Sequence, residues 1–179
     1  MSTRIAFLRA VNVGKRTVPM GRAAGIAEGL GYDDVWTHAN SGNVIFDATG
    51  SRAAIERAMG EALEAELGFE VTTFVRTAAE LRTAMGKQPF DVAAGDTYFI
   101  TFLKDPPSAA TKRALEGASN DFDTLVVVGR DVHWLMHGTS TDTTVPKKTW
   151  DLVGVRQSTS RNTNLLGKLV AKIDAKHAG

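Results

Sequence analysis

The alternation of short apolar segments with amphipathic segments constrains the fold of this chain more than any other feature of its sequence. Residues 5–9 form a short apolar run of the kind found in buried strands, whereas residues 51–67 place apolar side chains four apart on one helical face. The segments of the first half are strands at 5–9, 35–39, 44–47 and 69–76 and helices at 20–30 and 51–67. Ser51 is predicted to cap the second helix and Gly68 to end it, and Thr77 and Glu80 predict a capping box for a short helix after the last strand. The order of the strands and the two longer helices, βαββαβ, predicts a ferredoxin-like split unit.

The same order of elements begins again after residue 96. Residues 87–96 contain Pro89 and Gly95 and show no period, so they are expected to be a linker. Beyond them the sequence predicts strands at 97–103, 124–128 and 132–136, a helix at 108–116 and a closing helix from about 161 to 176. The predicted fold class is therefore α+β, with two ferredoxin-like βαββα(β) halves, residues 1–90 and 91–179, whose sheets are antiparallel or mixed.

Three glycines occur within the predicted helix at 20–30. Gly21, Gly25 and Gly29 are spaced by four and share one face. Each costs about 1 kcal/mol of helix stability relative to alanine. This spacing predicts that the glycine face packs closely against a sheet.

The composition excludes several classes of protein. Hydrophobic residues make up 43% of the chain and charged residues 23%, which is typical of a globular protein with a sizeable core. There is no cysteine, so disulfide frameworks, thiolate metal sites and cysteine nucleophiles are excluded. No apolar run is long enough for a membrane span and no signal peptide is evident, so a cytoplasmic protein is expected.

The charges are distributed unevenly although the net charge is only +1. Residues 1–22 carry +5 with no acidic residue, residues 147–179 also carry +5, and the residues between them carry −9. If the two basic ends converge, they would form one positive surface suited to phosphate, nucleotide or nucleic acid. The alternative is that the charges are scattered over solvated faces.

The most informative segment is RAVNVGKRTVP at residues 9–19, which connects the first strand to the first helix. Its glycine and the adjacent cations Lys15 and Arg16 suit a phosphate or carboxylate at the helix N-terminus. Asn12 would hold the loop through a local turn, and Gly14 would adopt a positive φ. The pattern is not that of a Walker A loop, and both residues also fit a loop with no ligand.

Two further polar segments are candidates for binding. At the predicted start of the closing helix, Arg161 and Asn162 would lie in the first turn, where arginine opposes the helix dipole. Either an anion compensates there, or Arg161 pairs with an acidic residue elsewhere. In the turn at residues 40–43, two asparagines flank Ser41 and Gly42, and their amides would donate to a ligand or merely form a tight turn.

These segments resemble a known family. The runs LRAVNVGKRTVPM at 8–20, SGNVIF at 41–46, and TSRN followed by KL at 159–162 and 168–169 are similar to those of the bacterial domain-of-unknown-function family 1697. The likeness spans essentially the whole chain and implies an α+β protein of ferredoxin-like halves with no established activity. Thr163 stands where members commonly have an aromatic residue. The positions that the resemblance marks are Arg9, Asn12, Val13, Gly14, Ser41, Gly42, Asn43, Arg161, Asn162 and Lys168.

The leading functional hypothesis is binding of an anionic ligand, either a small molecule or a nucleic acid, at a basic site. The site would be formed by the first strand-to-helix loop, the turn at 41–43 and the start of the last helix. The predicted ligand-binding residues are Arg9, Asn12, Gly14, Lys15, Arg16, Ser41, Gly42, Asn43, Arg161, Asn162 and Lys168. Cofactors are not expected.

Two alternatives belong to other classes. A small enzyme acting on a phosphorylated or carboxylated metabolite would need a base or nucleophile nearby, for which His38, Ser41 and Asp47 are the candidates. An interaction protein would instead pair through exposed sheet edges. No metal site is expected, because the spacing around His133 and His137 matches no standard site, and both are predicted to be surface histidines.

Overall fold

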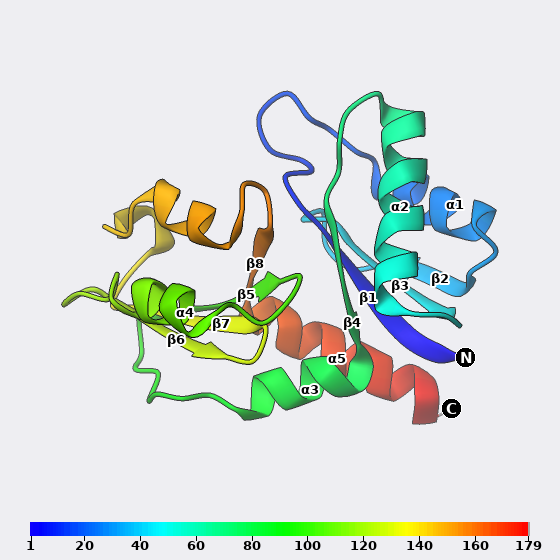
Figure 1. Ribbon diagram of the computed structural model, residues 1–179. Helices are drawn as coiled ribbons and strands as arrows, with labels where there is room; N and C mark the ends of the chain where they lie inside the picture. The colour runs from blue at the N-terminus through cyan, green and yellow to red at the C-terminus, as the bar shows by residue number, and fades with distance from the viewer. Residues whose placement is uncertain (179) are drawn as a thin grey trace. The chain divides into compact units, whose positions relative to one another are not determined.

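Residues 1–178 are described by a computed structural model (Figure 1). The chain divides into two compact units, Met1–Leu81 and Arg82–Gly179. Each unit contains its own four-stranded sheet, and every pair of neighbouring strands is antiparallel. The α+β fold with two ferredoxin-like halves is therefore confirmed.

The first unit follows the predicted order of elements. Its strands and helices are β1 (Ser2–Leu8), α1 (Met20–Gly29), β2 (Asp33–Thr37), β3 (Asn43–Ala48), α2 (Arg52–Leu67) and β4 (Thr73–Thr77). The sheet order is β2-β3-β1-β4. Helix α2 begins and ends as the sequence predicts, because Ser51 accepts a hydrogen bond from the Ala54 N–H and Gly68 adopts a left-handed conformation at φ 76°.

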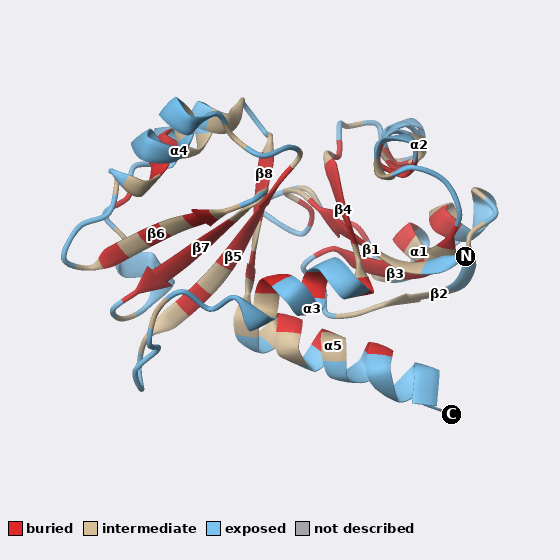
Figure 2. Cartoon of the chain, turned by 60° about the horizontal axis from the view of Figure 1, so that its bottom comes forward, coloured by how far each residue is buried: buried red, intermediate tan, exposed pale blue. Residues whose placement is uncertain are grey.

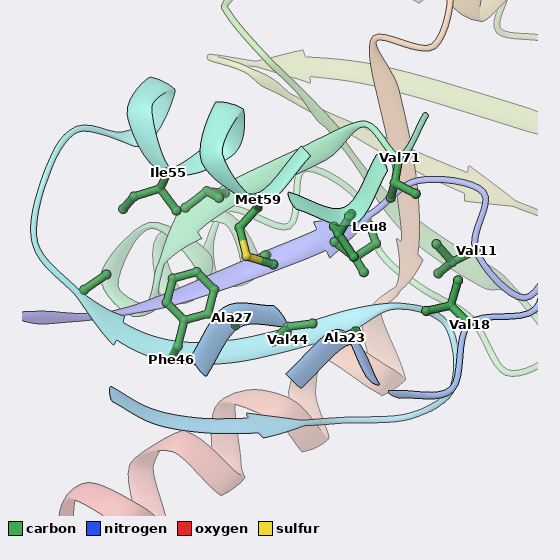
Figure 3. Packing of buried hydrophobic residues seen from close by; sticks show 14 residues of the cluster. Leu8, Val11, Val18, Ala23, Ala27, Val44, Phe46, Ile55, Met59 and Val71 are labelled. Carbon is green, nitrogen blue, oxygen red and sulfur yellow. The ribbon is translucent and has the colours of Figure 1, made fainter. Parts of the chain in front are cut away.

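The core of the first unit lies between the sheet and its two helices (Figure 3). Ala23 and Ala27 of α1 and Met59 of α2 belong to the same buried cluster as Leu8 and Phe46 of the strands. Burial of such apolar side chains contributes about 25 cal/mol per Å² of buried area. This cluster holds the end of β1 in place, and the predicted ligand-binding loop starts there.

The predicted packing of the glycine face of α1 is wrong. Gly21, Gly25 and Gly29 are exposed, and no described atom lies within 4 Å of the position that a Cβ would take on any of them. Ala23 and Ala27 contact the core instead. Each of these alanines lies two positions after a glycine, which is about 200° around the helix, so the alanines occupy the face opposite the glycines.

The second unit repeats the sheet order of the first. Helix α3 (Ala78–Gly86) spans the boundary between the units and begins with the predicted capping box, in which Thr77 and Glu80 exchange hydrogen bonds. The later elements are β5 (Thr97–Leu103), α4 (Ala109–Glu116), β6 (Asp123–Val128), β7 (Asp131–Met136), the 3-10 helices η1 (Ser140–Asp142) and η2 (Lys147–Val153), β8 (Ser158–Asn162) and α5 (Thr163–Ala178). The sheet order is β6-β7-β5-β8.

The expected start of the closing helix is wrong. Residues Ser158–Asn162 form β8, which pairs with β5 in antiparallel register, and α5 begins only at Thr163. Arg161 is therefore a strand residue opposite Ile100 and not part of a first helical turn. The sequence STSRN lacks the apolar alternation of a strand, so only its backbone pairing with β5 makes it one.

His133 is buried, so its prediction as a surface residue is wrong. Strand β7 is buried from Val132 to Met136 (Figure 2), and His133 has no exposed surface. Its Nδ1 lies 2.5 Å from the hydroxyl oxygen of Tyr98. His137 is exposed, as expected, and its Nδ1 lies 3.2 Å from Asp96.

Residues 1–178 hold neither a cluster of metal ligands nor a membrane-spanning helix. No group of three or more histidine, aspartate or glutamate side chains in this range is arranged to hold a metal ion. No helix in the same range is both long enough and apolar enough to cross a membrane.

Candidate anion-binding site

The loop after β1 folds into a tight turn that exposes a cation. The Arg16 N–H donates to the Val13 carbonyl at 3.3 Å, and Gly14 takes the first central position of this turn with φ 63°. Glycine is favoured at that position in type II′ turns because a positive φ is required there. Val13 is 66% exposed, and Lys15 is also exposed. The turn therefore presents Lys15 to solvent.

Asn12 fixes the position of this loop with its side chain. Its Oδ1 accepts a hydrogen bond from the Val18 N–H at 2.7 Å, and its Nδ2 donates to the Asn40 carbonyl at 2.5 Å. Asn12 itself has φ 56°, a conformation that asparagine tolerates better than most residues. The side-chain amide thus closes the loop on itself and ties it to the turn between β2 and β3.

Gly42 allows that turn to approach the end of β1. The Leu8 N–H donates to the Gly42 carbonyl at 2.8 Å. A Cβ at Gly42 would lie 2.4 Å from Val11 Cγ2 and 3.0 Å from Leu8 Cβ, and the residue has φ 82°. Both the space and the backbone conformation therefore require glycine.

The polar side chains of the turn at 40–43 differ in their accessibility. Asn43 is fully buried, and its Nδ2 donates to the His38 carbonyl at 2.7 Å and to Ser41 Oγ at 3.0 Å. Ser41 is exposed, and the bond from Asn43 leaves its hydroxyl hydrogen unused. Asn43 therefore holds the turn together, whereas Asn40 and Ser41 are the residues of the turn that are exposed to solvent.

Within residues 1–178, two cations of the loop have no acidic partner. The Arg16 guanidinium carbon lies 5.2 Å from the centroid of the Phe69 ring, and this cation–π contact orients the side chain. Neither Lys15 nor Arg16 forms an ion pair with any residue in that range. Arg22, in contrast, pairs with Glu66 at 2.7 Å. The loop thus carries a local positive charge that the fold leaves uncompensated.

Arg9 lies at the junction of β1 and the loop. It is half-exposed, and its N–H donates to the Thr72 carbonyl at 2.9 Å. This bond extends the pairing of β1 with β4 by one residue. The Arg9 backbone is therefore held in place beside Thr72, three residues after Phe69.

Asp47 lies apart from Ser41, so the three residues considered for enzymatic chemistry do not form a triad. Asp47 Oδ1 accepts a hydrogen bond from Thr3 Oγ1 at 2.8 Å near the far end of β3. At about 3.3 Å per residue, Asp47 is about 13 Å along the strand from Asn43, next to which Ser41 lies. Asp47 therefore does not orient a His38–Ser41 pair.

The predicted site residues of the second unit have other surroundings. Arg161 is 6% exposed, and its Nη1 donates to Thr159 Oγ1 and to the Ser160 carbonyl, both at 2.9 Å. Burial lowers the pKa of Arg161 to about 10, so it remains charged at neutral pH. Asn162 Oδ1 accepts a hydrogen bond from the Asn164 N–H at 2.8 Å and caps α5. Lys168 is exposed on α5.

The sequence does not predict the roles of two further residues, Phe69 and Arg76. The sequence predicts that Phe69 lies in a strand, and it does not predict the cation–π contact of this ring with Arg16. Arg76 is buried and lies opposite Ile5, just as Arg161 lies opposite Ile100. Both arginines precede a residue that caps the next helix, and this shared pattern is a signal that the sequence carries.

Together these features define an α+β protein of two ferredoxin-like units, the first of which presents an uncompensated cationic loop tethered by an asparagine. The chain belongs to the family described as a protein of unknown function, DUF1697, whose model matches residues 1–133. This range includes the loop at 9–19 and the turn at 40–43.

A solved structure is also similar to this chain. The conserved bacterial protein SP0830 from Streptococcus pneumoniae matches with a TM-score of 0.77 and 17% sequence identity, over 97% of this chain and 99% of that chain. At this identity the likeness supports the fold alone. No curated protein matches the chain.

Proposed function

We propose that the first unit binds a phosphate-bearing anion at the loop of residues 9–19 and the neighbouring turn at 40–43. The observation that carries the proposal is that Lys15 and Arg16 have no acidic partner within residues 1–178, although the loop that holds them is fixed in place. An unpaired charge pair on a rigid loop gains from an external anion without a large ordering cost.

The side chains differ in their expected roles. Arg16 offers a planar fork of N–H donors that suits two oxygens of one phosphate, and Lys15 adds a point charge. Arg9 and the Ser41 hydroxyl are the other proposed contacts. Asn12, Gly14, Gly42 and Asn43 are proposed as positioning residues, because their polar atoms or backbone conformations hold the loop and the turn.

The second unit has no assigned part in this proposal. Arg161 and Asn162 use their side chains for bonds within β8 and at the start of α5. Lys168 is exposed on α5, and no contact directs it to a ligand. The proposed ligand site therefore rests on first-unit residues alone.

The test is a titration of the whole chain at low salt. Inorganic phosphate, a nucleoside diphosphate, a sugar phosphate and a short single-stranded oligonucleotide would be compared by calorimetry and by thermal unfolding. A ligand that binds only the folded state adds about 2.7 kcal/mol to the unfolding free energy at a hundredfold excess over Kd. Saturation by the small phosphates, or only by the oligonucleotide, distinguishes a metabolite from a nucleic acid.

The decisive variant is Lys15→Ala/Arg16→Ala, which removes two cations and should abolish binding. Lys147→Ala/Lys148→Ala is the matched control, because it removes two adjacent exposed cations from η2. The proposal predicts unchanged affinity in the control. Equal loss in both variants would indicate a non-specific charge effect, and no binding by the wild-type chain to any of the four ligands would contradict the proposal directly.

A further inference from the structure

Strand β6 (Asp123–Val128) is an edge strand whose last four residues are apolar. It pairs only with β7 in the sheet order β6-β7-β5-β8, and its residues 124–128 are TLVVV. Such a strand, with no lysine, proline or glycine, is a template for pairing with another extended chain. The tight turn to β7 pairs Val128 with Asp131, so alternate N–H groups of β6 point away from the sheet.

All three outward N–H groups of β6 are occupied by side chains. The Val127 N–H donates to Glu116 Oε1 of α4, and the Leu125 N–H donates to Ser119 Oγ, both at 2.9 Å. The Asp123 N–H donates to Asn120 Oδ1 at 2.9 Å. The three side chains come from the end of α4 and the turn that follows it.

The same arrangement occurs at an edge of the first unit. Strand β4 lies at the end of the order β2-β3-β1-β4. Its Val75 N–H donates to Glu56 Oε1 of α2 at 2.9 Å, and its Thr77 N–H donates to Glu80 Oε2 at 2.8 Å. Side-chain acceptors thus cover donors of an edge strand in both units.

We infer that Glu116, Ser119 and Asn120 act as an edge guard that prevents β6 from pairing with β6 of a second copy of this chain. Antiparallel pairing of two identical edges around a twofold axis would extend the sheet through the same residues of each copy. That pairing needs the outward N–H groups as donors. Because these N–H groups already donate to the edge guard, they are not available for that pairing. A second copy of the chain is the expected partner, since it is always present at the same concentration as the strand itself.

The first test uses the unmodified chain. Hydrogen exchange should show the amide hydrogens of Leu125 and Val127 protected, although they lie on the open edge of the sheet. In Glu116→Ala/Ser119→Ala these two amides should exchange about tenfold faster or more in dilute protein, because each has lost its acceptor. Free exchange at both positions in the wild-type chain would contradict the guard without any variant.

The second test measures self-association of the full chain by sedimentation. Glu116→Ala/Ser119→Ala should associate increasingly as protein concentration rises, whereas Glu116→Gln keeps an acceptor oxygen and should behave as the wild type. Lys112→Ala removes the cation 3.8 Å from Glu116 but leaves the guard, so it controls for loss of the ion pair.

A rescue variant locates the association. Thr124→Lys places a charge on the edge strand and, added to Glu116→Ala/Ser119→Ala, should restore the wild-type sedimentation. Persistent association in that triple variant would show that another surface is responsible and would overturn the inference. So would a double variant that remains folded by circular dichroism and sediments as the wild type does at every concentration.

Discussion

At the scale of single residues, Gly42 shows how one position couples the turn at 40–43 to the end of β1. Its φ is 82°, and a Cβ on this residue would lie only 2.4 Å from Val11 Cγ2, so there is no room for a side chain. We expect Gly42→Ala to lower the free energy of unfolding by about 2–4 kcal/mol, from left-handed strain and overpacking together. Urea denaturation measures this change.

Gly31 separates the two contributions to that loss. It has a similar φ of 79°, but nothing lies within 4 Å of its Cβ position. Gly31→Ala should therefore cost only about 1–2 kcal/mol, the strain alone. Equal losses in the two variants would show that the close approach of Val11 adds nothing.

We expect His133 to make the stability of the second unit depend on pH. Burial lowers the pKa of His133; the Asp131 carboxylate raises it and the Lys87 cation lowers it further. Below about pH 6.5 the unfolded chain binds a proton at this histidine that the folded chain does not, so stability falls as the pH drops through that value. His133→Asn should remove this part of the slope in urea titrations between about pH 5 and 7.

One outcome would contradict the predicted role of His133 in the pH dependence of stability. If the slope below about pH 6.5 is the same in His133→Asn and in the wild type, another group causes it. Tyr98→Phe should keep the slope, since the histidine remains buried, while it lowers stability at every pH by removing the partner of Nδ1.

At the scale of elements, Asp123 fastens the segment after β7 to the sheet. Its buried carboxylate accepts hydrogen bonds from Trp134 Nε1 at 2.9 Å, Thr143 Oγ1 at 2.7 Å and the Thr144 N–H at 3.0 Å. Burial alone raises the pKa of Asp123, but these hydrogen bonds outweigh burial and hold the pKa below its ordinary value. One side chain thus joins β6, β7 and the residues around η1.

Removing this carboxylate should be costly. We expect Asp123→Ala to lower the unfolding free energy by about 3–5 kcal/mol at neutral pH, because several donors lose a charged acceptor. The stabilisation from ionised Asp123 is present above about pH 3.9 and is lost as the pH falls through the lowered pKa of the folded state. Urea unfolding at neutral pH and acid titration measure the two effects, and an unchanged acid midpoint in the variant would contradict the second.

The exposed glycines of α1 offer a stabilising change. Gly25 lies in the helix with open space around its Cβ position. Gly25→Ala should therefore raise the unfolding free energy by about 0.5–1 kcal/mol, as measured by urea denaturation. Destabilisation by this substitution would show that the glycine face is required for a close contact absent from the described structure.

At the scale of the whole molecule, the near-neutral net charge of +1 makes any anion binding a local property. Charges farther apart than the screening length of about 10 Å at 0.1 M salt interact weakly. We therefore expect the affinity for a phosphate ligand to fall with salt, with a slope set by Lys15 and Arg16. The slope should persist in Lys147→Ala/Lys148→Ala, and its loss in that control would assign the effect to the overall field.

The sequence predicted where the helices begin and end better than it predicted the surroundings of the polar side chains. Ser51, Gly68, and the pair Thr77 and Glu80 marked helix ends correctly, because caps depend on neighbouring residues. The strand that contains Arg161 is not predicted, because the polar run around this residue lacks strand periodicity. The importance of Asn12 was predicted, but its two hydrogen-bond partners were not, since one of them is distant in sequence.

The sequence by itself determined the elements of the first unit and most of those of the second, because hydrophobic period and capping chemistry act over a few neighbouring residues. Only the tertiary structure decided that residues 158–162 are a strand, that His133 is buried, and that the glycine face of α1 is exposed. It also decided that Lys15 and Arg16 have no acidic partner within residues 1–178. These properties depend on which distant segment supplies the hydrogen bond, the packing surface or the counter-charge. Local sequence patterns do not predict which segment that is.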